Sequence, residues 1–130
     1  MATQPERLAA RTKQFAIRIV RLFKSLPKND EARIIGKQLL GAGTSVAANY
    51  RAVCRSRSKA EFISRMSVVV EEADETAFWL ELLIGTSIIP EVRLRDLLTE
   101  ANELLAIFAA SLWTARQERK TQSVNVSMTR

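Results

Sequence analysis

Two glutamates in the middle of the chain, Glu72 and Glu75, come nearest to a catalytic pattern. On a helix they share one face, and Trp79 continues that face. Paired carboxylates can transfer protons or hold a metal ion. Carboxylate metal bundles, however, normally add a Glu-x-x-His motif on two helices, and this sequence has no histidine. We therefore favour a structural polar network, formed with Asn49 and Arg51, that fixes helix register or subunit contacts; catalysis is the less favoured alternative.

Other familiar forms of catalysis lack their essential residues. Without histidine there is no imidazole base, no His-based triad and no common zinc site. Gly41 and Gly43 lack the further residues of a phosphate-binding loop. Cys54 is the single cysteine and has no histidine to activate it, so we expect a packed, inert thiol. The sequence predicts no enzymatic activity, no cofactor and no metal site.

A line of arginines follows the first expected helix. Arg7, Arg11, Arg18 and Arg21 are spaced so that they share one helix face. Such a face can track phosphates and release counterions when it binds nucleic acid. It can equally be solvated, or paired with acidic helices of the same or a neighbouring subunit. We weigh these two interpretations evenly.

A second basic cluster lies between the second and third expected helices. It contains Arg51, Arg55, Arg57 and Lys59. Arginine binds phosphate in a bidentate geometry, and the start of a helix attracts anions. We assign Arg55, Arg57 and Lys59 to a nucleic-acid surface. We expect Arg51 to serve the acidic residues of the following helix.

Charge is divided unevenly along the chain. Residues 1–58 carry a net +9, residues 59–118 a net −6 and residues 119–130 a net +3, within an overall charge of +6. A polarised molecule of this kind favours either a polyanion or another copy of itself as partner.

Apolar periodicity predicts one all-α domain over residues 1–118. Glycine and proline are scarce, which favours long helices with short connections. The repeats of apolar residues at three-and-four spacing predict an antiparallel up-down-up-down four-helix bundle. The expected helices span 5–26, 31–55, 59–85 and 90–118, followed by a flexible basic tail over 119–130.

Local signals support these boundaries. Thr3 with Glu6 and Ser58 with Glu61 have the spacing of capping boxes, and the second helix starts after Asn29 or Asp30, either of which is a good N-cap. No apolar run approaches the roughly 18 residues that a membrane span needs. The chain starts without a secretory pattern and has one cysteine, so we expect a cytoplasmic protein that does not contact membranes.

Short motifs in a fixed order resemble a known bacterial family over about residues 15–112. They are Phe15-Ala16, Leu26-Pro27, Gln38-Leu-Leu40 with Thr44-Ser45, Ala48-Asn49-Tyr50-Arg51, Ser58-Lys-Ala-Glu-Phe-Ile63, Glu72-Ala-Asp-Glu-Thr76 and Trp79-Leu80. Together they resemble the four-helix-bundle proteins called 23S rRNA intervening-sequence proteins, or S23 ribosomal proteins. One departure is that Ala52-Val53 stands where the family usually has Glu-Ala or Glu-Gly.

The resemblance implies a homopentamer with a basic surface and no enzymatic activity. It also implies kinship with accessory proteins of diversity-generating retroelements, which bind nucleic acid and a reverse transcriptase. The first hypothesis is therefore a non-enzymatic, oligomeric adaptor that binds the backbone of RNA or DNA, as an accessory to a reverse transcriptase. The alternative is a structural or protein-interaction module whose oppositely charged halves drive self-assembly.

Overall fold

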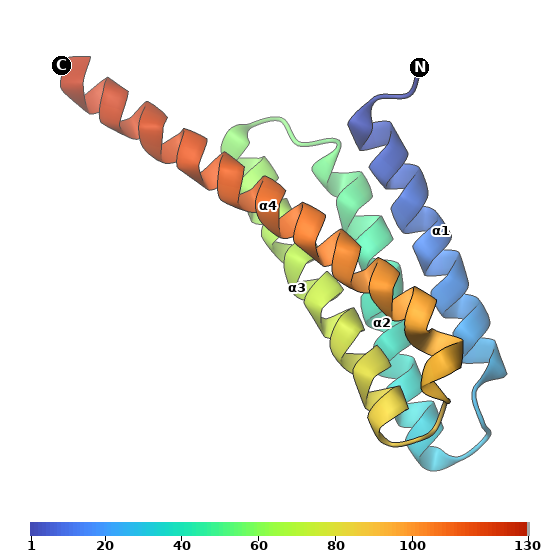
Figure 1. Ribbon diagram of the computed structural model, residues 1–130. Helices are drawn as coiled ribbons and strands as arrows, with labels where there is room; N and C mark the ends of the chain where they lie inside the picture. Colours follow the sequence, from blue (N-terminus) through green and yellow to red (C-terminus); the bar gives the residue numbers. More distant parts are fainter. Residues whose placement is uncertain (130) are drawn as a thin grey trace.

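The computed structural model describes residues 1–129 of the chain, and these form four helices without a strand. The helices are α1 (Gln4–Ser25), α2 (Asp30–Val53), α3 (Lys59–Gly85) and α4 (Glu91–Thr129) (Figure 1). The prediction of an all-α helical bundle is confirmed. The first three helices begin and end within two residues of the expected positions.

Side-chain caps fix the starts of these three helices. The Thr3 hydroxyl accepts a hydrogen bond from the Glu6 N–H, and the Glu6 carboxylate accepts one from the Thr3 N–H, which completes a capping box. Asn29 caps α2 and Ser58 caps α3, each by accepting a backbone N–H with its side-chain oxygen. The capping box expected at Ser58 is not completed within the described residues, because the Glu61 carboxylate pairs with Arg65 instead. These caps set the residue at which each chain segment enters the bundle.

The helices pack in chain order, α1 on α2, α2 on α3 and α3 on α4. The predicted apolar seams face one another in a single core. Its largest fully buried side chains are Phe15, Ile19, Leu39, Val46, Met66, Val69, Leu80, Leu83, Ile89, Leu94, Leu104 and Phe108. Gly43 lets α1 and α2 approach closely, because a Cβ at this position would meet Ile19 Cγ1 at 2.8 Å.

The α2 seam differs from the pattern at one turn. Asn49 occupies a position that the spacing assigns to the seam, but it is only half-buried. Tyr50 is buried instead, and its ring lies 5.0 Å from that of Phe108. A large aromatic side chain gains more from burial than an amide, which would need hydrogen-bond partners in the core.

The last helix differs most from expectation. We expected it to end near residue 118, yet α4 continues to Thr129 and projects past the bundle (Figure 1). Neither glycine nor proline interrupts residues 91–129, so nothing in the backbone stops the helix. Arg130, the last residue of the expected tail, lies outside the described residues, and the flexibility of the tail stays a prediction.

Candidate nucleic-acid interface

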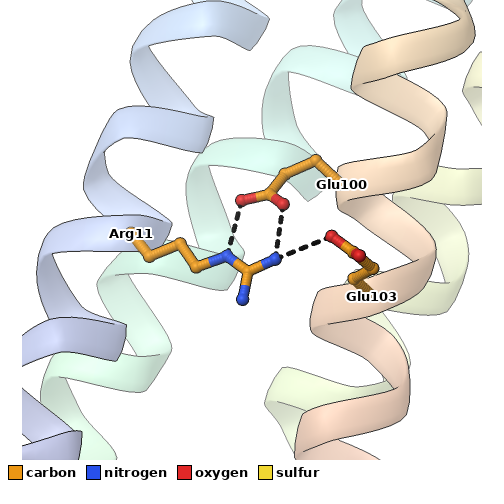
Figure 2. Close-up of polar contacts among 3 residues, drawn as sticks. All are labelled: Arg11, Glu100 and Glu103. Carbon is orange, nitrogen blue, oxygen red and sulfur yellow. Dashed lines mark hydrogen bonds and ion pairs between the residues drawn. The ribbon is translucent and has the colours of Figure 1, made fainter.

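Arg11, in the middle of the arginine line on α1, is held by two acidic residues of α4. Its Nε donates to Glu100 at 2.8 Å, and one terminal nitrogen donates to Glu100 at 2.6 Å and to Glu103 at 2.9 Å (Figure 2). This is a bidentate pair with a third bond added, the geometry for which guanidinium is best suited. Arg11 therefore joins the N-terminal and C-terminal helices of one subunit.

The titration of these groups reflects the pairing. The hydrogen bond from Arg11 lowers the pKa of Glu100, although partial burial acts in the opposite direction. The bond to Glu100 also raises the pKa of Arg11. Arg11 is therefore paired with acidic residues of its own subunit, which is the second of the two interpretations given for the arginine line.

The other arginines of α1 are arranged differently. Arg7 donates to the backbone oxygen of Ala2 at 2.6 Å. Arg18 adds to the positive field at Glu100. Arg18 and Arg21 are exposed and form no ion pair within residues 1–129. These two residues keep their charge available to a partner.

The junction of α2 and α3 gathers four arginines around one open hollow of about 560 Å³. We call this group the basic corner; it consists of Arg51, Arg55, Arg57 and Arg65. The single acid in the lining is Glu61, and Arg65 pairs with it at 2.7 Å. The three remaining arginines are exposed and form no ion pair within the described part of the chain.

The local sequence explains why these charges meet. Helix α2 ends at Val53, and the short connection leads to Ser58, which caps α3. The positive end of the α3 dipole therefore lies at the corner. A second guanidinium nitrogen of Arg65 donates to the backbone oxygen of Ala52 at 2.7 Å, which anchors α3 to the end of α2.

Two further groups lie in a neighbouring hollow that shares Arg57 with the corner. Lys59, expected to contact nucleic acid, forms an ion pair with Glu118 of α4. The hydroxyl of Ser56 is buried and has no hydrogen-bond partner among the described residues. A buried hydroxyl without a partner costs stability, so it is a group that a ligand or water can satisfy.

Arg65 belongs to the corner but was not predicted. Its signal in the sequence is the position four residues after Glu61, which places both side chains on one face at the start of α3. The predicted basic cluster ended at Lys59, so Arg65, which lies further along α3, was not included.

The predicted polar network does not form within one subunit. Trp79 Nε1 donates weakly to Glu75 at 3.3 Å, but Asn49, Arg51 and Glu72 form no hydrogen bond or ion pair within residues 1–129. Partial burial and then the neighbouring carboxylates raise the pKa of Glu72. A role for these residues in subunit contacts stays a prediction.

Cys54 was expected to be packed, but it is exposed at the end of α2. It lies beside Tyr50, whose pKa is raised first by burial and then by Cys54. The reason is the helix end: the chain turns away from the core directly after Val53, so the next side chain faces solvent.

Two negative findings concern residues 1–129. They contain no group of three or more His, Cys, Asp or Glu residues that could hold a metal ion. They also contain no helix that is both long and apolar enough to cross a membrane.

Comparison with known proteins agrees with this architecture. Residues 7–110 match the model of the 23S rRNA-intervening sequence protein family. The chain belongs to this family. A member of the S23 ribosomal protein family from Bacteroides thetaiotaomicron, described as a protein with unknown function, has a similar crystal structure with a TM-score of 0.78 and 31% sequence identity. No curated protein matches the sequence.

The extent of the match divides α4 into two parts. The similarity covers 98% of the Bacteroides protein but 85% of this chain, and the family model ends at residue 110. The basic corner lies inside the region that defines the family. The projecting part of α4 lies beyond the family model.

Proposed function

We propose that this protein is a non-enzymatic, oligomeric adaptor that binds the phosphate backbone of RNA or DNA through the basic corner. The observation that carries the proposal is the set of exposed arginines around the hollow. Arg51, Arg55 and Arg57 form no ion pair within residues 1–129, while the one acid that lines the hollow, Glu61, is already paired with Arg65.

The chemistry of the corner fits phosphate. Guanidinium groups bind phosphate oxygens in pairs, and the positive end of α3 adds a favourable field. Contacts of this type supply affinity with little choice of sequence, because phosphates are common to all nucleic acids.

Exposed Arg18 and Arg21 on α1 supply a second contact region for an extended nucleic acid. Helix α1 ends at the opposite end of the bundle from the α2–α3 junction, so a partner must follow the length of the molecule to touch both (Figure 1). Arg11 is not part of this surface in our proposal, because Glu100 and Glu103 hold it.

The name of the family is consistent with a protein that works together with nucleic acid. Its name refers to an intervening sequence of 23S ribosomal RNA, and the solved relative has unknown function. The resemblance to accessory proteins of retroelements suggests a reverse transcriptase as protein partner and five subunits as the assembly.

The test is binding of labelled structured RNA and duplex DNA, measured by fluorescence anisotropy over a series of salt concentrations. The variant carries Arg55→Glu with Arg57→Glu, and the matched control carries Arg93→Glu with Arg95→Glu on α4. All four residues are exposed and form no ion pair among the described residues.

For duplex DNA, the log–log dependence of affinity on salt has a slope of about −0.9 per phosphate contact. We expect the corner variant to lose about two contacts' worth of slope, while the control keeps the slope of the natural protein. Equal losses in both variants would show a response to net charge alone. Retained binding in the corner variant would place the nucleic acid elsewhere.

A further inference from the structure

The part of α4 beyond the family model contacts its own subunit near its start: Leu112 and Ala115 are buried, Arg116 donates to the Ser67 hydroxyl at 3.3 Å, and Glu118 pairs with Lys59. Among residues 91–128 of α4, Ala115 is the last buried one, and residues 118–128 are all exposed. We call residues 113–129 the arm; it extends away from the bundle (Figure 1). The arm is the continuous end of the 39-residue α4, so its exposed apolar side chains, rather than its helicity, point to a partner.

One face of the arm exposes large apolar side chains to water, which is unfavourable. Trp113 is 64% exposed, Val124 55% and Met128 79%. Their separations of eleven and four residues place them along one stripe of the helix. Lys120 lies within the stripe and Arg116 borders it, and both line an open hollow together with Trp113, Val124 and Ile63 of α3. The arm therefore offers both apolar surface and positive charge.

An exposed face of α3 has the opposite character. Glu71, Glu75 and Phe78 are exposed and Leu82 is half-buried, and the four follow one another at spacings of four, three and four residues. None of the acidic residues from Glu71 to Glu81 forms an ion pair within residues 1–129. Phe78 is 51% exposed and packs edge-on against the ring of Trp79. We call this surface the acidic face.

We propose that the arm of one copy packs along the acidic face of α3 in a second copy. The arm has residues at the same spacings of four, three and four as the acidic face, namely Trp113, Gln117, Lys120 and Val124. The two helices can therefore align side by side. In this arrangement the exposed aromatic and aliphatic side chains of both helices leave water together.

Charge selects the second copy over nucleic acid as the occupant. The acidic face repels phosphate, so it fits a basic partner, and the arm provides Arg116, Arg119 and Lys120. The one acid among these residues, Glu118, is already paired with Lys59. Phosphate contacts would also leave the apolar stripe of the arm in water.

The arm and the acidic face are different surfaces, so the contact is heterologous. Each copy that donates an arm still offers a free acidic face, and the contact continues until a ring closes or a filament grows. This inference does not depend on the basic corner, and it assigns a role to the segment that lies outside the family model.

The two tryptophans of the protein report on the two sides of the contact, because Trp79 lies at the acidic face and Trp113 on the arm. In a Trp79→Phe variant, Trp113 is the sole indole emitter. Sedimentation velocity gives the mass during dilution, and fluorescence gives the environment of Trp113. We expect its emission to move to longer wavelength as the assembly dissociates. Unchanged emission across dissociation, or a monomer at every concentration, would overturn the proposal.

Charge reversal identifies the surfaces. The arm variant carries Arg116→Glu with Lys120→Glu, and the face variant carries Glu71→Lys with Glu75→Lys. We expect each variant alone to raise the dissociation constant at least tenfold, and an equimolar mixture of the two to associate again. The control with Arg93→Glu and Arg95→Glu should assemble as the natural protein does.

Three outcomes would overturn the proposal. They are assembly of the arm variant at natural affinity, a mixture that does not associate, and an arm variant that loses nucleic-acid affinity but keeps its assembly. The last result would assign the arm to nucleic acid. Because the basic corner is untouched in these variants, failure of this inference leaves the corner experiment unaffected.

Discussion

Replacing Arg11 with glutamine should destabilise the subunit and leave nucleic-acid binding unchanged. Arg11 makes three hydrogen bonds to carboxylates of α4, and they join the two ends of the chain. The side chain of Glu100 is 18% exposed and that of Arg11 is 35% exposed. Water therefore screens the pair in part, and Glu100 would lose its partner in a partly buried position.

The magnitude lies between two limits. An exposed ion pair contributes about 0.2–1 kcal/mol, and a hydrogen bond to a charged group about 1.5–3 kcal/mol. With Glu103 largely exposed, we expect Arg11→Gln to cost about 1.5 kcal/mol. For a domain of this size that loss lowers the unfolding midpoint by roughly 3–8 °C.

A double-mutant cycle with Glu100→Gln isolates the pair. Urea unfolding of the natural chain, both single variants and the double variant should be followed at one protein concentration, since assembly also contributes to stability. We expect a coupling free energy of about 1 kcal/mol. A value within about 0.3 kcal/mol of zero would refute the reasoning, because that is the scatter of independent sites.

Acid should remove the same effect. The pKa of Glu100 is lower in the folded chain than its ordinary value, so the pair contributes fully above the pKa of the unfolded glutamate, about 4.3. The contribution is lost as pH falls below that value and through the lower pKa of the folded state. The stability difference between the natural chain and Arg11→Gln should therefore shrink in this acid range and stay constant at neutral pH.

Other predictions concern helix packing and capping, and each is checked by thermal unfolding. Gly43→Ala should destabilise the subunit by about 1–3 kcal/mol, because the added methyl group would overlap Ile19. Gly41→Ala, the matched control in the same helix, should stabilise it by about 0.5–1 kcal/mol, because a Cβ there meets nothing within 4 Å. Thr3→Ala should cost about 1 kcal/mol by removing the cap on the Glu6 N–H.

The elements of the fold were predictable because their determinants are local. The capping residues Thr3, Asn29 and Ser58 mark helix starts from the sequence alone, and three-and-four spacing gives the buried face of each helix. The burial of Tyr50 in place of Asn49 could not be predicted from the spacing of apolar residues alone. A neighbouring residue reaches the same interior when its partner, here Phe108, comes from another helix.

The candidate site was predictable in composition but not in pairing. Arg11 and Arg55 are both unaccompanied arginines in the sequence, and nothing in the local pattern separates them. Their difference arises from segments distant in sequence, since Glu100 of α4 pairs with Arg11 while no acid among the described residues pairs with Arg55. Charge spacing on one helix identifies a basic face, but the packing of the others decides which of its charges are free.

The projecting end of α4 is a second case in which the sequence predicted only part of the structure. Val124, Val126 and Met128 are the only apolar residues among 119–129, too few to predict packing in the bundle, and the structure leaves these three side chains exposed. This composition does not indicate that the segment is unfolded, because a helix continues until a residue or a cap stops it. Trp113 is exposed where the bundle ends, and Val124 and Met128 repeat its stripe. An apolar stripe that is not buried within its own subunit is evidence for a contact with another molecule. The acidic face of α3 in a second copy is the surface whose residue spacing and charge match those of the arm.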